Sequence, residues 1–445
     1  MLNINLIRDN PDILRKSQKR RNADEQVVDR ILELDRLWRE KLKRIESLKR
    51  ERNEKSALVA KLVRAGEKEG IDEIKTVMKN INSEIEKLET DVNGLKKERD
   101  SLLWNVPNII DDAVPDGIDE SENVPFRFWG EAQVYRDDLE EFKKESQNMM
   151  PFKVLENRPE SHVDILERYN LGDTLRAAKV SGARFYYLKN QLVNMELALE
   201  QFAVEHLEKK GFEIVEPPFM LIKRAIDGAT DFTAFEDTLY KIENEDLYLI
   251  ATSEHAIASM YMDEVFEVDL LPLKIAGISS CFRKEAGAHG KDTKGIFRVH
   301  QFNKIEQFVF CEPEQSPEFF NALLQNAEEI YQQLNIPYRV IKICAGDLGN
   351  VASIKYDIEG WMPSQGKFRE LVSCSNVKDY QTRRLNIRYR KNNEYLYPHT
   401  LNSTAIATTR TMVAILENYQ NEEGIKVPDA LRKYLDFDFI EKLGV

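Results

Sequence analysis

The sequence predicts an α+β protein, with a long antiparallel coiled-coil hairpin at the N-terminus and a larger domain built on an antiparallel β-sheet flanked by helices. Three observations support this fold class. Apolar residues follow a heptad rhythm between Pro11 and Pro107, which are consecutive prolines. Later in the chain, apolar runs of strand length follow one another without regular strand–helix alternation. Neither a P-loop nor a GxGxxG glycine motif is present, so a nucleotide site here would belong to neither of those types.

The heptad rhythm has two halves. The second half steps alternately by four and three residues through Ile74, Met78, Ile81, Ile85, Leu88, Val92 and Leu95. The first half is less regular and runs through Ile31, Leu34, Trp38, Ile45 and Leu48. Lys41 interrupts this first seam, and two glycines within residues 65–70 lie where a helix would stop and turn. We therefore expect two helices of roughly 37 residues, each about 55 Å long, folded back on one another.

The surface of this hairpin is rich in basic residues. They are Lys41, Lys43, Arg44, Lys49, Arg50, Arg52, Lys55, Lys61, Arg64 and Lys68. One interpretation is a coiled coil for dimerisation or spacing, and the other is a probe that reaches a large partner. Residues 1–110 hold 25 Lys and Arg against 21 Asp and Glu, whereas the rest of the chain holds 39 against 56. The net charge of −13 therefore excludes only a chain that is basic throughout, and a nucleic-acid partner of the hairpin stays possible.

Residues 111–140 change in composition, with ten acidic residues, two basic residues and two prolines. Such a segment is typical of a solvated linker. We therefore expect three parts: the hairpin over residues 1–110, an acidic linker over residues 111–140, and a larger domain over residues 141–445, in which any catalytic residues would lie.

The remaining composition bears on the location of the protein. The N-terminal residues lack the apolar stretch of a secretory signal, and no run of 18 apolar residues occurs. The four cysteines are well separated and form no CxxC pair. We therefore expect a cytoplasmic protein whose cysteines are reduced thiols. We expect no membrane segment and no structural zinc site.

The densest group of reactive residues lies in a strand–loop–strand segment over residues 281–306. Alternation on a strand would place Arg283 and Glu285 on one face, where they could bind a phosphate and an exocyclic amine of one nucleotide. The returning strand would present on one face His300, Phe302, Lys304 and Glu306. The loop between the strands carries groups suited to polyphosphate, namely His289, Lys291 and Lys294. The alternative is a solvated hairpin with cross-strand ion pairs.

Three further segments add candidate residues. Glu370 and Ser373 supply the hard oxygen ligands that Mg²⁺ prefers. Thr252 and Glu254 end an apolar run and could hold an ammonium group and a small polar side chain. Small residues over 401–409 precede Arg410 and an apolar helix, which would allow close packing and place one cation at the site.

In this order the motifs resemble the seryl-tRNA synthetase family of class II aminoacyl-tRNA synthetases over nearly the full chain. They include LIRDNPDILRKS at the start, the fRxE–loop–RVHQF hairpin and WMPSQGKFRELVSCSN, and GFEIVEPPFM matches the first class II motif at a dimer interface. The resemblance implies a cytoplasmic homodimer that activates L-serine with ATP to seryl-adenylate and charges tRNA(Ser). It also implies that the hairpin binds the tRNA and that tRNA(Sec), where present, is charged too.

The resemblance also implies roles for individual residues. The catalytic residues would be Arg283, Glu285, Glu370 and Arg410. ATP would be bound by Arg283, Lys284, Glu285, Val299, His300, Gln301, Phe302, Glu370, Leu371, Val372, Ser373 and Arg410. Serine would be bound by Thr252, Ser253, Glu254, Arg283, Glu306, Asn402 and Thr404. Glu370 and Ser373 would hold Mg²⁺, and no zinc is expected. The serine carboxylate is the nucleophile in this chemistry, so the protein acts by positioning and charge stabilisation.

Some positions depart from the common bacterial pattern. Ser253 stands in a Thr-Ser-Glu where many members have Thr-Ala-Glu, and Asn402–Ala407 reads NSTAIA rather than NGSGLA. Thr404 keeps a hydroxyl, so serine recognition is expected to survive. Two alternatives remain: a class II synthetase for another small amino acid such as threonine, and a non-charging paralogue. The second would be expected to lose Arg283, Glu370 or Arg410, all of which are present.

Overall fold

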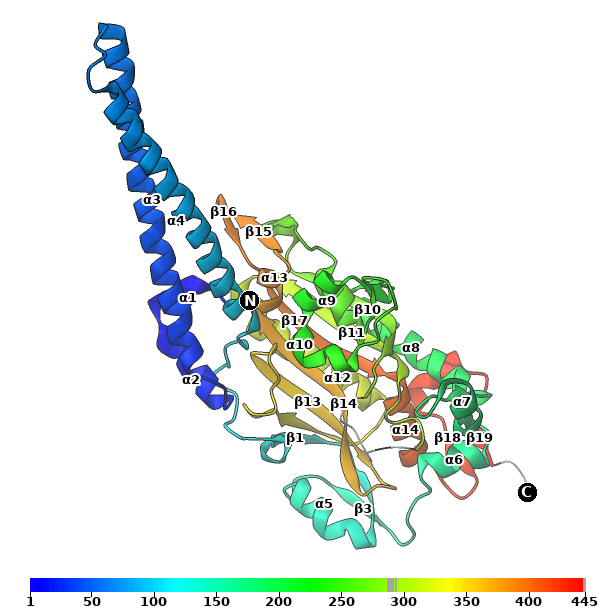
Figure 1. The fold of residues 1–445 in the computed structure, drawn as a ribbon. Helices are drawn as coiled ribbons and strands as arrows, with labels where there is room; N and C mark the ends of the chain where they lie inside the picture. Colours follow the sequence, from blue (N-terminus) through cyan, green and yellow to red (C-terminus); the bar gives the residue numbers. More distant parts are fainter. Residues whose placement is uncertain (286–291, 293, 443–445) are drawn as a thin grey trace. The chain divides into compact units, whose positions relative to one another are not determined.

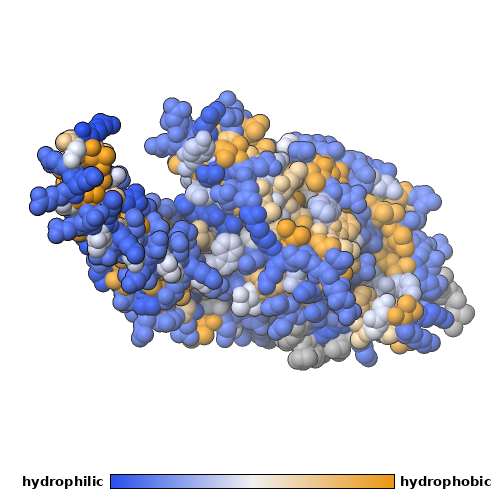
Figure 2. Space-filling model, turned by 45° about the horizontal axis from the view of Figure 1, so that its top comes forward, coloured by the Kyte–Doolittle hydropathy of each residue, from blue (hydrophilic) through white to orange (hydrophobic). Residues whose placement is uncertain are grey.

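The computed structural model describes residues 1–285, 292 and 294–442. The chain divides into two compact units, of which the first spans Met1–Ile109 and the second begins at Ile110. Figure 1 shows the long helical arm of the first unit and the sheet of the second. On the face shown in Figure 2, hydrophilic residues cover most of the surface, as expected of a chain in which 32% of residues are charged. None of the described helices combines the length and apolar character needed to cross a membrane.

The first unit is an antiparallel helical hairpin preceded by two short helices. Its elements are α1 (Ile4–Asp9), α2 (Pro11–Arg20), α3 (Gln26–Ala65) and α4 (Ile71–Asn105). The turn lies where the glycines predicted it, because Gly66 and Gly70 adopt φ angles of +77° and +82°. This left-handed conformation is open to glycine at little cost and ends the first helix. The predicted hairpin is confirmed.

The seam of the hairpin differs from the prediction at one position. Its buried residues are Ile45, Leu48, Ile81, Ile85 and Val92, with Trp38, Leu42 and Leu88 partly buried against them. Leu42, not Lys41, continues the seam, since the steps from Trp38 to Leu42 to Ile45 are again four and three. Lys41 lies beside the seam, and its Nζ is 2.7 Å from Asp91 Oδ2 on α4. The predicted interruption was therefore wrong.

A buried ion cluster holds the base of this hairpin. The Asp35 side chain is fully buried and accepts hydrogen bonds from Arg8 at 2.7 Å, Arg99 at 2.8 Å and Arg39 at 3.0 Å. Arg99 also lies over the ring of Trp38, with its Cζ 4.6 Å from the centroid. Burial alone would raise the pKa of Asp35, but the guanidinium groups of Arg8 and Arg99 outweigh it and lower the pKa. One carboxylate thus joins α1, α3 and α4.

Substituting Asp35→Asn is expected to destabilise the base of the hairpin by about 3 kcal/mol, because it removes the buried carboxylate that pairs with Arg8 and Arg99 and leaves Arg99 with Asp100 alone. Hydrogen exchange of the amides over residues 28–39 measures the effect. Glu33→Gln is the matched control, since Glu33 forms an exposed pair with Arg30 that is worth at most about 1 kcal/mol. Because the pKa of Asp35 is lowered, its contribution is present at neutral pH and is lost as the pH falls through that lowered pKa. Equal protection in both variants would contradict this account.

The second unit is built on an eight-stranded sheet. Its strands, in spatial order, are β1 (Val124–Trp129), β12 (Tyr338–Lys342), β13 (Ile354–Met362), β14 (Lys367–Lys378), β17 (His399–Ala407), β11 (Gln301–Cys311), β10 (Leu273–Phe282) and β6 (Glu213–Val215). All neighbours are antiparallel except β6 and β10. The predicted α+β class is confirmed, with β6 making the sheet mixed.

Alternation along β11 determines which face of the sheet is free for a site. Ile305 and Val309 belong to the main core, with α8 (Gln191–Lys209), α12 (Ser316–Gln333) and α14 (Thr408–Asn418). Phe308 and Phe310 belong to a second core with α11 (Ser253–Ser259) on the opposite face. Phe302, Lys304 and Glu306 are an even number of residues from Phe308, so their side chains lie on the same face of the strand as Phe308 and Phe310. This is the face away from the main core.

One expectation about the second unit was wrong. The segment 111–140 is not a solvated linker, because it contains β1, the edge strand of the main sheet, and β2 (Ala132–Tyr135). Pro125 is tolerated there because the pairing of β1 shifts register at this residue and an edge strand leaves one side unpaired. Further along the chain, strand β17 continues to Ala407, and α14 begins at Thr408.

Candidate functional site

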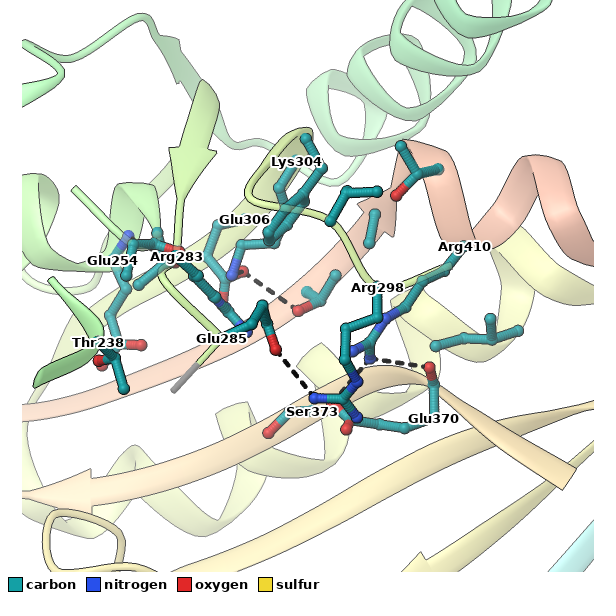
Figure 3. A pocket seen from close by; sticks show the side chains of 18 of the residues that line it. Thr238, Glu254, Arg283, Glu285, Arg298, Lys304, Glu306, Glu370, Ser373 and Arg410 are labelled. Atoms are coloured by element: carbon teal, nitrogen blue, oxygen red, sulfur yellow. Dashed lines mark hydrogen bonds and ion pairs between the residues drawn. The ribbon is translucent and has the colours of Figure 1, made fainter. Parts of the chain in front are cut away.

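A pocket of about 450 Å³ opens on the free face of the sheet, lined by residues of β11, β13, β14, β17 and α11 and by the turn after β10 (Figure 3). The predicted site residues that line it are Thr252, Glu254, Arg283, Glu285, Val299, Phe302, Glu306, Glu370, Leu371, Ser373, Asn402, Thr404 and Arg410. Segments up to about 160 residues apart in sequence therefore meet in one cavity, as the resemblance implied.

Five predicted residues do not line the pocket. Ser253 is fully buried, and its hydroxyl donates to the Gly277 carbonyl at 3.3 Å. His300 Nδ1 lies 2.7 Å from the Arg283 carbonyl oxygen, so this side chain braces the hairpin. The other three are Lys284, Gln301 and Val372. Of the three loop residues expected to meet polyphosphate, His289 and Lys291 lie outside the described residues, and Lys294 is exposed.

Arg283 and Glu285 reach the pocket by a turn, not by strand alternation. Strand β10 ends at Phe282, and Glu285 adopts a φ angle of +50°, so the expected strand conformation here was wrong. Arg283 is fixed by two hydrogen bonds: its backbone N–H donates to His300 O at 2.9 Å and its Nε donates to Ala251 O at 3.2 Å. Its Cζ lies 5.1 Å from the ring centroid of Phe302. The guanidinium is thus held over the aromatic floor of the pocket.

Two β-bulges bring the remaining groups onto the same side. Residues three apart on a regular strand point to opposite faces. The pairing of β13 with β14 shifts by one residue, because Ile358 faces Val372 and Glu359 faces Glu370. This bulge allows Glu370 and Ser373 to line the same pocket. The pairing of β11 with β17 shifts in the same way between Ile305 and Glu306, beside Thr404.

Most cations of the pocket are paired with carboxylates. The pairs are Arg298–Glu285 at 3.0 Å, Lys304–Glu306 at 2.6 Å, Lys355–Asp357 at 3.2 Å and Arg410–Glu370 at 3.4 Å (Figure 3 shows the first and last). Arg283 differs, since within the described part of the chain no carboxylate lies within ion-pair distance of it. The described part of the pocket therefore offers one guanidinium whose charge is available to an anion.

Glu370 is suited to hold a divalent cation. Burial alone would raise the pKa of this carboxyl, but Arg410, Lys355 and Arg283 outweigh it and lower the pKa to about 2. The side chain is 46% exposed, and that surface faces the pocket. Among the described residues no group of three or more His, Cys, Asp or Glu side chains is placed around one point. An ion at Glu370 and Ser373 would take its other ligands from phosphates and water, and Mg²⁺ is usually coordinated in this way.

Glu254 and Glu306 form an acidic corner at the other end of the pocket. Glu254 accepts a hydrogen bond from Gln381 Nε2 at 2.9 Å. Burial, together with the charge of Glu306, raises the pKa of Glu254 to about 7. The Thr404 hydroxyl donates to Glu306 Oε2 at 3.3 Å. Two carboxylates beside a hydroxyl match an ammonium group with a small polar side chain.

Sequence reasoning missed several lining residues, including Phe297, Arg298 and Lys355. Lys355 carried a readable signal. It alternates with Asp357 and Glu359 on one strand, and charged residues at alternate positions give that strand one polar face, which either solvent or a ligand must cover. Phe297 and Arg298 gave no comparable signal, because the residues just before the returning strand follow no regular period.

Comparisons with known proteins cover both units. Residues 1–110 match the family model described as the seryl-tRNA synthetase N-terminal domain, and residues 237–419 match the tRNA synthetase class II core domain (G, H, P, S and T). A curated relative from Thermoplasma acidophilum, named serine–tRNA ligase, is 50% identical, with 99% of this chain and 100% of the relative covered. Another with the same name, from Thermococcus onnurineus, is 54% identical, with 98% and 96% covered.

Solved structures agree with these matches. The seryl-tRNA synthetase of Pyrococcus horikoshii, crystallised with ATP, superposes with a TM-score of 0.97 at 50% identity, and both chains are covered completely. The cytoplasmic serine–tRNA ligase of Naegleria fowleri, in complex with AMP, gives a TM-score of 0.87 at 38% identity, with 100% of this chain and 99% of that chain covered.

Proposed function

Because the chain belongs to the seryl-tRNA synthetase family, we propose that it activates L-serine with ATP to seryl-adenylate and transfers the serine to the 3′ end of tRNA(Ser). The observation that best supports this is Arg283, whose guanidinium points into the pocket without a carboxylate partner among the described residues. One available positive charge between an acidic corner and a nucleotide-sized cavity suits a reaction between two anions, the serine carboxylate and the α-phosphate.

In the first step one serine carboxylate oxygen attacks the α-phosphorus of ATP, and the bond to the bridging oxygen breaks as pyrophosphate leaves. Arg283 would hold the α-phosphate and the serine carboxylate together and stabilise the charge that builds up on phosphorus. Glu285 would accept from the adenine amino group, and Phe302 would stack on the ring. Arg410 would contact the γ-phosphate or the outer face of adenine. In the second step a ribose hydroxyl of the tRNA attacks the acyl carbon and AMP leaves.

Mg²⁺ would be held by Glu370 and Ser373, and it supplies charge neutralisation for the departing pyrophosphate. The Glu370 carboxylate stays ionised at neutral pH because its pKa is lowered to about 2. The ion pair between Glu370 and Arg410, at 3.4 Å, holds the carboxylate next to the arginine in the pocket.

Serine would be recognised in the acidic corner. Glu254 and Glu306 would hold the ammonium group, and Thr404, Asn402 and Thr252 would surround the hydroxyl. The bulge beside Thr404 directs this side chain into the pocket. A class II enzyme for another small amino acid would share the ATP end of the pocket. The residues of the acidic corner would therefore distinguish a serine enzyme from such an enzyme.

The affinity for serine is expected to rise with pH. Below pH 7 Glu254 is mostly protonated, because its pKa is raised to about 7, and a neutral carboxyl binds an ammonium group weakly. The KM for serine should fall about tenfold from pH 6 to pH 8, following the ionised fraction of one such group. Glu254→Gln should remove this pH dependence, whereas the KM for ATP should follow a different profile in both proteins. A serine KM that is flat with pH in the unmodified enzyme would contradict the role of Glu254.

The hairpin would bind the long extra arm of the tRNA. Several of its basic residues already pair across the hairpin, such as Lys41 with Asp91 and Lys49 with Glu89. Within the described chain no carboxylate pair is found for Lys43, Arg50, Arg52, Lys61, Arg64 and Lys68. These six are the candidates for phosphate contacts, and binding should weaken as salt rises. We also propose that the protein is a cytoplasmic homodimer and that it serylates tRNA(Sec) where that tRNA exists.

Charging of tRNA transcripts tests the transfer step. The purified protein, with serine, ATP and Mg²⁺, should acylate a tRNA(Ser) transcript. It should fail with a transcript from which only the long extra arm has been deleted, and a tRNA(Sec) transcript tests the second substrate. Activation of serine without charging of any of these transcripts would point to a paralogue that does not charge tRNA.

A further inference from the structure

One ion pair of the pocket has no part in the mechanism above. Lys355 and Asp357 lie two residues apart on β13, and Lys355 Nζ is 3.2 Å from Asp357 Oδ2. Their side chains are 23% and 6% exposed, and the accessible part of Lys355 lines the pocket. An ammonium group buried to this degree is costly unless it is paired or meets a ligand.

The sheet order determines which end of the pocket Lys355 occupies. The acidic corner includes Glu306 on β11 and Thr404 on β17, whereas Lys355 is on β13, beyond β14. With neighbouring strands about 4.8 Å apart, three steps separate β13 from β11 by roughly 14 Å. In the register of β13 with β14, Asp357 faces Ser373. In the same registers Lys355 faces Ser375, which faces Asn402 on β17. Lys355 therefore lies on the β13–β14 side of the pocket with Ser373, and its charge acts on Glu370. Glu306 lies three strands away, and Asn402 is the nearest in register of the groups assigned to serine.

The pair leaves hydrogen-bonding capacity unused on both sides. Asp357 Oδ1 is buried and has no hydrogen-bond partner among the described residues. An ammonium group has three donors, and the contact with Asp357 uses one of them. Asp357 and Glu370 raise the pKa of Lys355 against the opposing effect of burial, so the cation is charged at neutral pH. A purely structural pair would be expected to satisfy its buried atoms more completely.

We propose that Lys355 is a further catalytic residue, which binds the β- and γ-phosphates of ATP and the pyrophosphate that leaves, while Asp357 positions its ammonium group. The inference rests on the proposed function, since it takes the pocket to be an ATP site. Lys355 then adds a positive charge at the phosphate end, which the Glu370 carboxylate would otherwise make negative. Phosphate oxygens would accept the two remaining N–H donors.

Kinetics of the Lys355→Met variant test this role. In ATP–pyrophosphate exchange, the KM values for ATP and for pyrophosphate should each rise by about tenfold to a hundredfold, the usual effect of losing one hydrogen bond to a charged group. The KM for serine and the Kd for AMP should change by less than about twofold, because neither molecule carries β- or γ-phosphates. Lys367→Met is the matched control, since Lys367 is exposed on β14 and lies outside the pocket. Equal losses for AMP and ATP would overturn the proposal.

A double variant separates phosphate binding from simple neutralisation of Asp357. If Lys355 served only to neutralise Asp357, then Lys355→Met with Asp357→Asn would restore the KM for ATP of the unmodified enzyme, and the proposal would be overturned. If Lys355 binds phosphate, the double variant stays impaired for ATP and pyrophosphate, and Asp357→Asn alone is affected less than Lys355→Met. Calorimetry with ATP and AMP reports on Lys355 even if the unmodified protein shows no serine-dependent exchange, which would instead refute the proposed function.

Discussion

Replacing Arg283 with alanine is expected to abolish serine-dependent ATP–pyrophosphate exchange, with a loss of at least about a thousandfold in kcat/KM. The reason is that Arg283, among the described residues of the pocket, has no carboxylate partner. Other cations of the pocket pair with carboxylates, whereas Arg283 is held by backbone hydrogen bonds and lies over Phe302. In the proposed mechanism, its removal would take away the charge that brings two anions together and stabilises the transition state.

Two control variants make this result interpretable. Arg283→Lys keeps the charge but loses the planar pair of donors, so we expect it to recover only a small part of the activity. Arg224→Ala should leave exchange unchanged, because Arg224 forms an exposed pair with Asp263 in the same unit, away from the pocket. Thermal unfolding of the three variants should be similar. If Arg283→Ala keeps more than a tenth of the exchange activity, the central role of this residue is wrong.

Shortening the hairpin is expected to reduce charging of tRNA(Ser) by at least about a hundredfold, because it removes most of the unpaired basic residues, while serine activation continues. The cut should spare the ion cluster around Asp35, so deletion of residues 46–86, with a short glycine–serine turn, is preferable to removal of residues 31–103. The retained part keeps the pair between Lys41 and Asp91 at 2.7 Å. Exchange and charging are measured on the same preparation.

The matched control replaces charge without changing length. Substituting Arg50, Lys61 and Arg64 by glutamine should weaken charging and lessen its salt dependence, with exchange unaffected. Loss of both activities in the shortened protein would show that the hairpin is not a separable module. Charging that survives the deletion would remove the hairpin from the account of tRNA binding.

The fold was predictable from sequence wherever a simple period governs the chain. The heptad spacing predicted both helices of the hairpin, and Gly66 and Gly70 predicted the position of its turn. The error at Lys41 arose because a seam can be continued by a neighbouring residue, here Leu42. Residues 124–129 were missed as a strand because acidic neighbours and Pro125 resemble a linker, and only pairing with β12 shows the edge strand.

The site was predictable from motifs more than from geometry. The ordered motifs indicated the family, which the comparisons confirm, and they named most of the pocket residues. Strand alternation would have separated Glu370 from Ser373, and it placed Arg283 and Glu285 on a strand that ends before them. A bulge and a residue at positive φ bring these groups together, and neither has a sequence period. Lys355 was missed because it belongs to no motif.

Amino-acid-dependent ATP–pyrophosphate exchange tests the central claim most directly. With Mg²⁺ present, the unmodified protein should exchange pyrophosphate into ATP when serine is supplied, and threonine and alanine should support far less exchange. This outcome would assign the acidic corner of Glu254, Glu306 and Thr404 to serine. No exchange with serine, or faster exchange with threonine or alanine, would contradict the proposed function.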